Sequence, residues 1–265
     1  MAILNVTPDS FSDAGKFLSP DDALRRAEIM IGEGADIIDV GGESTRPGSE
    51  RVDVDEEIRR AVPVIEEIAK RFDTPISIDT SKSKVAAYAV DAGAEIINDI
   101  SGLRFDAYLA HVAAESCAGL VLMHSRGSFE TMHTEPAVDD IFAELSADFI
   151  RAISLAKASG VADENIALDV GVGFGKTQEQ NLELLAKLDK IVLEFEGYPL
   201  MVGSSRKSFI GKLLGGLTAD ERLSGSIASV AISVFNGANI LRVHDVKESV
   251  DAIKIAQAIR KEVIP

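Results

Sequence analysis

Short apolar runs alternate with longer amphipathic segments along the whole chain, and this alternation restricts the fold more than any other feature. Each run has the length and the Ile, Val and Leu content of a strand that is buried on both faces. Eight runs separated by helix-length segments predict an α/β fold, a closed parallel (β/α)8 TIM barrel. The runs are Ala2–Val6, Asp36–Val40, Pro75–Ile78, Glu95–Ile97, Leu120–Met123, Ile166–Leu168, Pro199–Val202 and Asn239–Val243.

The length fits one such barrel, because about 250 residues is typical and the chain has 265. Several helix-to-strand junctions share one pattern, in which a glycine (Gly34, Gly93 or Gly237) ends a helix and a strand begins within two residues. No linker or low-complexity tract interrupts the repeat. We therefore expect a single domain over residues 1–265, with an open doubly wound sheet as the alternative.

The segment after the second strand carries the clearest helix signals. Asp53 occupies an N-cap position, and Glu56 follows three residues later, as in a capping box. The apolar residues that recur there at helical spacing predict one stripe facing the barrel, and they are Ile58, Val62, Ile65 and Ala69. Two later segments, Ala219–Phe235 and Val246–Val263, are also predicted helices.

Composition excludes several classes of protein. The net charge is −16, from 43 acidic and 27 basic residues, and this disfavours nucleic-acid binding. The single cysteine, Cys117, has no partner for an internal disulfide, and we expect it to be a small core residue. Met1–Val6 is too short for a signal peptide, and no run reaches the roughly 20 apolar residues of a membrane span. A cytoplasmic protein is the expectation.

Polar or glycine-rich residues follow nearly every apolar run. Barrel enzymes place their catalytic groups at this end of the strands, so the joint pattern predicts one composite active site. The clusters begin with Asn5 and Thr7–Ser10, continue with Asp39–Arg46, Asp79–Ser81, Asn98–Asp99 and His124–Arg126, and end with Asp169–Gly171, Ser204–Ser208 and Arg242–Asp245.

The residue types in these clusters suggest two subsites. Carboxylate, amide and ammonium groups suit a flat heterocycle with several N–H and carbonyl edges, and Asp79, Asn98, Asp169 and Lys207 form that set. Cationic groups suit a phosphate or pyrophosphate, and Arg46, Arg242 and His244 form that set. Asn5 lies beside the second set and offers an oxygen ligand for Mg²⁺.

Each of these residues also has an ordinary structural interpretation. Asp79 can cap a helix, Asn98 can satisfy strand-end backbone groups, and Asp169 can brace a turn. Arg46 and Lys207 can be solvated loop charges. Gly171–Lys176 is rich in glycine but lacks the spacing of a phosphate-binding P-loop, so we interpret it as a strand-to-helix turn.

Taken together and in this order, the clusters resemble the dihydropteroate synthases, pterin-binding enzymes, over essentially the whole chain. The two longest matching motifs are Ile3–Asp13, read Ile-Leu-Asn-Val-Thr-Pro-Asp-Ser-Phe-Ser-Asp, and Ile38–Gly48, read Ile-Asp-Val-Gly-Gly-Glu-Ser-Thr-Arg-Pro-Gly. The shorter ones are Ser77–Thr80, Ile97–Gly102, Gly173–Lys176, Ser205–Ser208 and Arg242–Asp245.

The resemblance implies a role for each matching residue. Asp79, Asn98, Asp169 and Lys207 would bind the pterin ring, with Arg242 stacked on it and assisting the phosphates. Asn5, Arg46 and His244 would hold pyrophosphate, with Mg²⁺ bound at Asn5. Thr45, Pro47, Phe174 and Ser208 would form the p-aminobenzoate pocket, where sulfonamides would compete.

Three departures from the family pattern stand out. Val170 replaces a usual proline, which should loosen the turn after Asp169. His124-Ser125-Arg126-Gly127 replaces the commoner His-Met-Gln-Gly and adds a charge near the site. Family members also usually carry a short segment before the first strand, so the resemblance leaves open how the lower end of the barrel is covered.

The implied reaction is an SN1-like substitution at the pterin methylene carbon, with pyrophosphate leaving and the amine of p-aminobenzoate attacking. Two loops, Thr7–Gly15 and Gly42–Arg51, would close over the site. A pterin-binding methyltransferase and a catalytically silent pterin-binding protein are the alternatives. Related synthases are usually dimers through late helices, and the small residues expected to permit such packing here are Gly225, Ser226, Ala228 and Ser229.

Overall fold

The computed structural model describes residues 1–7, 20–46 and 48–263 of the chain. Its centre is one parallel sheet in which each strand pairs with the next in sequence, from β1 to β8. All eight predicted strands are present, with ends within two residues of the apolar runs. They are β1 Ala2–Asn5, β2 Ile38–Gly41, β3 Ile76–Asp79, β4 Ile96–Asp99, β5 Gly119–Met123, β6 Ile166–Asp169, β7 Leu200–Val202 and β8 Ile240–Leu241.

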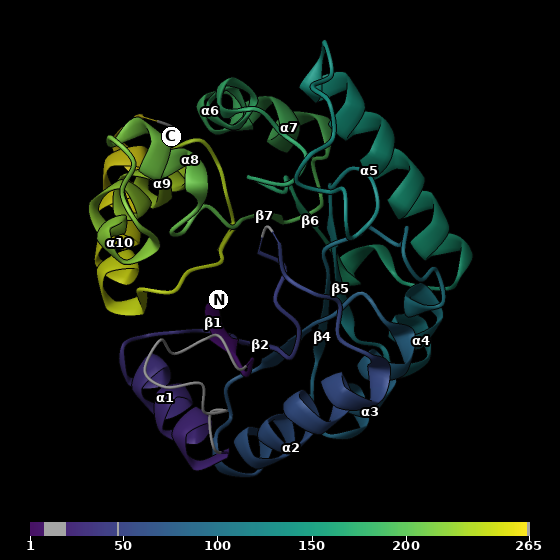
Figure 1. Ribbon diagram of the computed structural model, residues 1–265. Coiled ribbons are helices and arrows are strands. Elements are labelled where there is room, and N and C mark those ends of the chain that lie inside the picture. Colours follow the sequence, from purple (N-terminus) through teal and green to yellow (C-terminus); the bar gives the residue numbers. More distant parts are fainter. Residues whose placement is uncertain (8–19, 47, 264–265) are drawn as a thin grey trace.

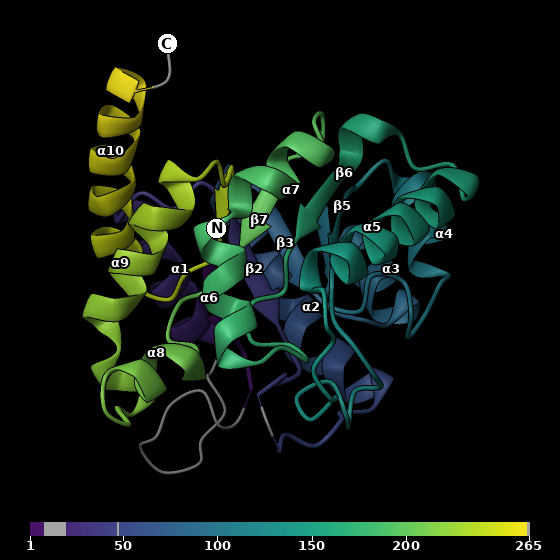
Figure 2. The same cartoon turned by 90° about the horizontal axis from the view of Figure 1, so that it is seen from above.

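Helices lie around the outside of the curled sheet, so the strands are enclosed by them (Figure 1). Turned by 90°, the molecule shows the helices standing beside the strands, with α10 along one side (Figure 2). The α-helices are α1 Pro20–Gly32, α2 Val54–Arg71, α3 Ser83–Asp91, α4 Leu109–Ser116, α5 Ile141–Ala158, α6 Gln178–Ala186, α7 Leu188–Glu194, α8 Ser208–Leu213, α9 Leu223–Phe235 and α10 Val246–Val263. Two 3₁₀ turns, η2 Asp163–Asn165 and η3 Ala219–Glu221, precede β6 and α9.

The strand register brings the predicted site residues into one row. Asn5 is paired with Gly41, Gly41 with Asp79, and Asp79 with Asn98. Further round the sheet, Asp169 is paired with Met123. Because all strands run in the same direction, their polar carboxyl ends meet at one end of the sheet.

Backbone hydrogen bonds also join the first strand to the segment that ends β8. Ile3 N donates to Val243 O at 2.9 Å, and Val243 N donates to Met1 O at 3.0 Å. The amino terminus of Met1 donates to Leu241 O at 3.0 Å. The two ends of the strand order are therefore in direct contact.

Helix α2 confirms the predicted cap and corrects the predicted stripe. Asp53 accepts a hydrogen bond from Glu56 N at 2.9 Å, but the carboxylate of Glu56 bonds to arginines instead of returning to the cap. Ala69 is exposed, because the buried face is rotated slightly from the predicted one. The residues of α2 that are buried are Glu57, Ala61, Val64, Ile65 and Ile68.

The prediction that Cys117 lies in the core was wrong. It is the C-cap of α4, with a left-handed φ of 56°, and its side chain is exposed. The thiol is therefore at the surface.

Most of the small residues of α9 that were expected to permit close helix packing are not at the surface. Ser226 and Ser229 are buried, and their hydroxyls bond within the chain to Arg222 O and Ser226 O. Gly225 faces Ile210, and of the four only Ala228 is exposed. The outward face of α9 instead carries large apolar residues such as Ile232. Among the described residues, no helix combines the length and apolar character that crossing a bilayer requires.

Candidate active site

The buried part of the site is an ion cluster built from residues of β2, β3 and β4 and from Arg242, just after β8. Arg242, just after β8, donates from Nε to Asp39 Oδ2 at 2.6 Å and from Nη2 to Asp79 Oδ2 at 2.5 Å. Asn98 Nδ2 donates to the same Asp39 oxygen at 3.3 Å. The guanidinium is therefore held between two carboxylates before any ligand enters.

Two oxygens of this cluster are buried without a described hydrogen-bond partner. They are Oδ1 of Asp39 and Oδ1 of Asn98. An unsatisfied buried acceptor costs about 1–3 kcal/mol, so these two oxygens are candidates to accept hydrogen bonds from the N–H groups of a ligand.

Asp169 and Lys207 form the next part of the site. Asp169 ends β6 and accepts a hydrogen bond from Gly171 N at 2.8 Å, which fixes its carboxylate. Lys207 precedes α8, and its ammonium lies 4.0 Å from the centre of the Phe174 ring. A Cβ on Gly203 would lie 3.7 Å from Arg242 Cβ and 4.0 Å from Asp169 Oδ2, so this glycine lies between the two side chains.

Burial shifts the pKa values of these groups toward their neutral forms. It raises the pKa of Asp79 to about 7, against the opposing charge of Arg242, and it also raises the pKa of Asp169. Burial, helped by Arg242, lowers the pKa of Lys207 to about 8. Perturbed carboxyl and amine groups in one cleft are typical of a functional site.

His244 lies near three arginines, Arg242, Arg206 and Arg46. Burial, together with the charges of Arg242, Arg206 and Arg46, lowers the pKa of His244 to about 3. Its ring is therefore neutral, with Nδ1 3.1 Å from Ser205 Oγ. Arg206 is paired with Asp245, whereas Arg46 is exposed and forms no ion pair with any described residue. The predicted phosphate set is thus brought together, with His244 as a neutral donor.

The side-chain oxygen of Asn5 is a ligand of the type that Mg²⁺ prefers. A Cβ on Gly41 would lie 3.3 Å from Asn5 Oδ1 and 3.7 Å from Asp79 Oδ2, so the glycine keeps space open between these oxygens. The described residues contain no cluster of three or more His, Cys, Asp or Glu that could hold an ion. Mg²⁺ commonly uses one or two protein oxygens and completes its shell with water and substrate phosphates, which agrees with this arrangement.

The described residues of the predicted p-aminobenzoate pocket lie outside the ion cluster, on the loop after β2, on the turn after β6 and at the first position of α8. Phe174 is buried against Lys207, Thr45 is half-buried, and Ser208 is exposed at the start of α8. Pro47 and the predicted closing loop over residues 8–15 lie outside the described residues. The described part of the Gly42–Arg51 loop is anchored by Lys82, which pairs with the buried carboxylates of Glu43 and Glu57.

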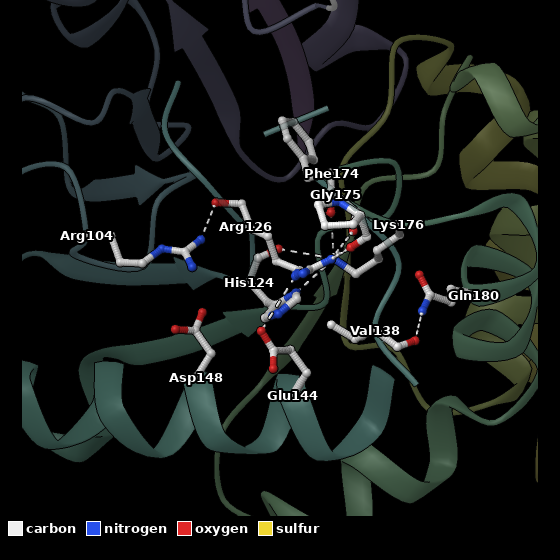
Figure 3. Close-up of polar contacts among 12 residues, drawn as sticks. Arg104, His124, Arg126, Val138, Glu144, Asp148, Phe174, Gly175, Lys176 and Gln180 are labelled. Atoms are coloured by element: carbon white, nitrogen blue, oxygen red, sulfur yellow. Dashed lines mark hydrogen bonds and ion pairs between the residues drawn. The ribbon is translucent and has the colours of Figure 1, made fainter. Parts of the chain in front are cut away.

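Lys176 ties the turn after β6 to the end of β5. Its ammonium lies 2.8 Å from Gly171 O, 3.1 Å from Phe174 O and 2.8 Å from His124 Nδ1 (Figure 3). Burial and Lys207 lower the pKa of Lys176 to about 7, while burial and Lys176 lower the pKa of His124 to about 2. The pair is thus a neutral imidazole accepting from a buried lysine, and it fixes the backbone beneath Phe174.

Several known proteins are similar to this chain in sequence and in fold. Residues 1–244 match the family described as pterin binding enzyme. Dihydropteroate synthase of Escherichia coli is 50% identical over 260 residues, covering 97% of this chain and 90% of that protein. Two solved synthases superpose on it: one from Clostridium difficile in the presence of pteroic acid (TM-score 0.90, 44% identity, covering 97% of this chain and 95% of that one), and one from Yersinia pestis with a sulfonamide drug (TM-score 0.92, 43% identity, covering 98% and 93%).

The chain belongs to the dihydropteroate synthases. It is accordingly a transferase of folate biosynthesis, as the resemblance implied. The pterin-binding methyltransferase and the silent pterin-binding protein are less consistent with relatives that carry the synthase name at half identity over nearly the whole chain.

Sequence reasoning left several residues of this synthase site without a role. Asp39 was seen only as part of a polar cluster, although an acid inside a buried strand is a signal in itself. His124 and Lys176 bond mainly to each other and to carbonyls, and His133 bridges two loops. Contacts of this kind to backbone oxygens have no sequence signature.

Two departures from the family pattern, Val170 and Arg126, lie near the turn after β6 and have structural consequences. Arg126 Nη1 donates to Gly175 O at 3.2 Å, and its Nε lies 3.5 Å from Glu144 Oε1 (Figure 3). Val170 is fully buried in the core. The added charge of Arg126 thus faces the backbone of the turn and Glu144, and both Arg126 and Lys176 restrain the turn that Val170 was expected to loosen.

Proposed function

We propose that this chain joins 6-hydroxymethyl-7,8-dihydropterin pyrophosphate to p-aminobenzoate, giving 7,8-dihydropteroate and pyrophosphate. The observation that carries this proposal is the pair of unsatisfied buried oxygens, on Asp39 and Asn98, beside a cluster of cations. The first feature suits the N–H edge of a pterin, and the second suits the pyrophosphate attached to it.

The pterin ring occupies the inner end of the site in this proposal. The free oxygens of Asp39 and Asn98, with the carboxylates of Asp79 and Asp169, accept its ring N–H and amino groups. Lys207 donates to a ring oxygen or nitrogen from the opposite side. Arg242 faces the ring as part of an ion cluster, because Asp39 and Asp79 already balance its charge.

The pyrophosphate extends toward Arg46 and His244. The guanidinium of Arg46 has no ion pair with any described residue, and a neutral His244 offers an Nε2–H to a phosphate oxygen. Asn5 would hold Mg²⁺ through its side-chain oxygen. A bound Mg²⁺ would neutralise the charge that builds up on the departing pyrophosphate.

The reaction needs no strong general base from the chain. The C–O bond to pyrophosphate breaks first, its electron pair leaves with the phosphate, and the electron-rich dihydropterin supports the positive methylene carbon. The neutral aniline nitrogen of p-aminobenzoate then forms the new C–N bond and loses a proton. Arg46 and His244 stabilise the leaving group, and the buried inner cluster keeps water from the carbon.

The p-aminobenzoate lies in the outer pocket, between Thr45, Phe174 and Ser208, with Pro47 completing it. The solved relative in the presence of pteroic acid supports this, since that molecule joins a pterin to an aminobenzoyl group. The relative solved with a sulfonamide drug supports competition by sulfonamides at the same place.

Three wider features belong to the same proposal. The sheet forms a closed (β/α)8 barrel and a single domain over residues 1–265, supported by the bonds between Val243 and the first strand. The enzyme acts in the cytoplasm. It forms a homodimer through α9 and α10, supported by their exposed apolar residues, which include Ile232, Phe235, Ile255 and Ile259.

Pyrophosphate release tests the function directly. The purified chain with Mg²⁺ and both substrates should release pyrophosphate and form dihydropteroate in equal amounts, and neither should appear when p-aminobenzoate is omitted. Release in its absence would indicate hydrolysis instead of condensation. Full activity in excess chelator would rule out the role of Mg²⁺, and a sulfonamide should raise the KM for p-aminobenzoate alone.

A further inference from the structure

His133 joins two loops that both contribute to the proposed p-aminobenzoate pocket. It lies between β5 and α5, and its Nε2 is 2.8 Å from Thr45 O, in the loop after β2. Its Nδ1 is 3.3 Å from Gly173 O, in the turn after β6. The ring also lies against Phe174, with 5.1 Å between the ring centres. One side chain therefore touches both walls of the pocket.

Both hydrogen-bond partners of the ring are carbonyl oxygens, and a carbonyl oxygen can only accept. A neutral imidazole has one N–H, so it can serve one of the two oxygens, whereas a doubly protonated ring serves both. The contact thus works by donation from the ring, and any replacement must supply N–H groups to preserve it.

The loop that carries His133 is firmly supported. The neighbouring Met132 is almost fully buried, in a small apolar cluster with Phe129 and Phe174. The backbone turns on itself through Met132 N to Ser128 O, at 2.8 Å. The loop that carries His133 also meets the loop after β2 at a second point, where the Arg51 guanidinium lies 5.6 Å from the centre of the Phe129 ring. His133 can therefore hold the loop after β2 in place.

We propose that His133 is a positioning residue for the second substrate: it ties Thr45 to the turn carrying Phe174 and so completes the p-aminobenzoate pocket. This rests on the proposed function of the site. His133 bonds to the backbone of pocket loops, and the buried pterin end contains none of its contacts. Replacing His133 should therefore weaken the binding of p-aminobenzoate and leave the binding of the pterin substrate unchanged.

Two substitutions separate the hydrogen bonds from the ring contact. His133→Phe keeps an aromatic ring against Phe174 but removes both donors. His133→Gln loses the ring but supplies an amide with two N–H groups at similar reach. Losing the ring's hydrogen-bond donation to these carbonyls should raise the KM for p-aminobenzoate by about tenfold in His133→Phe. The kcat at saturating p-aminobenzoate and the KM for the pterin substrate should stay within about twofold, and His133→Gln should recover most of the loss.

Steady-state kinetics with each substrate varied in turn, with thermal unfolding of each variant, form the test. An unchanged KM for p-aminobenzoate in His133→Phe would overturn the proposal. So would an equal rise in the KM for the pterin substrate, or a His133→Gln enzyme as impaired as His133→Phe. If His133→Phe does not fold, His133→Gln must show native KM values, and a large rise would count against the proposal. Failure of the proposed function is separate, because the unaltered chain would then release no pyrophosphate.

Discussion

The inner and outer ends of the site are built in different ways. At the inner end, Asp39, Asp79 and Asn98 lie on strands, are buried, and are bonded to one another or to Arg242. At the outer end, Thr45 and Ser208 lie on loop or helix-start positions and are half-buried or exposed. The outer walls are joined to each other through His133.

This difference assigns different physical tasks to the two ends. The inner end is assembled by folding itself, because its charges are part of the core and must be paired there. At the outer end, Thr45 and Ser208 are not part of the core, so removing their side chains should cost little stability. We therefore expect inner substitutions to affect stability and pterin binding, and outer ones to affect only the second substrate or turnover.

The largest contrast should come from two arginines. Arg242→Ala leaves Asp39 and Asp79 buried without their cation, and this should lower the free energy of unfolding by about 3–5 kcal/mol. Arg46→Ala removes an exposed side chain and should change it by less than about 0.5 kcal/mol while reducing turnover. Urea unfolding of both variants measures this, and equal destabilisation would remove the distinction between the two ends.

The next effect concerns pterin binding. Asp169→Ala or Asp79→Ala should weaken binding of a pterin by about 2–4 kcal/mol, because buried ring N–H groups lose a charged acceptor. Ser208→Ala, at the outer end, should leave pterin affinity unchanged. Calorimetric titration with a pterin that lacks phosphates isolates this step, and a native affinity in both aspartate variants would refute the ring assignment.

The affinity for a pterin should depend on pH through Lys207 of the inner end, with a change of about tenfold per pH unit. The pKa of Lys207 is lowered to about 8 by burial, so its ammonium is present below pH 8 and is lost above it. Loss of this ammonium should therefore lower pterin affinity above pH 8. Lys207→Arg, which stays protonated, should abolish the fall.

Lys176 serves as the control for that titration. Its pKa is lowered to about 7, so it also loses a proton in this region, but it bonds to backbone and His124. Lys176→Met should therefore keep the decline in affinity above pH 8. A decline that disappears in Lys176→Met and persists in Lys207→Arg would show that the wrong lysine had been assigned.

The inner end was also the part that the sequence allowed us to predict. Apolar runs located the strands, and parallel strands bring their carboxyl ends together, so Asp79, Asn98 and Asp169 could be assigned to one site before any coordinates. The pairing of Asp39 with Arg242 was not predictable in the same way. It joins residues 203 positions apart, and it depends on the curl of the whole sheet.

The outer end was less predictable because its contacts use backbone atoms. His133 bonds to Thr45 O and Gly173 O, and Lys176 bonds to Gly171 O, and no residue type in the sequence reveals that a carbonyl will be nearby. The misplaced Cys117 has a similar cause. Its exposure follows from a left-handed backbone angle at the end of α4, which an alanine-rich sequence does not indicate.

The smallest expected effect concerns Ser208 and the order of binding. If the outer loops are ordered by the first substrate, p-aminobenzoate should bind measurably only when pyrophosphate and Mg²⁺ are present. In that loaded enzyme, Ser208→Ala should weaken p-aminobenzoate by about 1 kcal/mol, roughly fivefold, since one hydrogen bond at an exposed position is lost. Calorimetry with and without pyrophosphate and Mg²⁺ measures both quantities. Equal affinity of the native chain in the two conditions would mean that the outer pocket is as preformed as the inner one. An unaltered affinity in loaded Ser208→Ala, with a sulfonamide still competing, would remove Ser208 from the pocket while leaving the pocket itself in place.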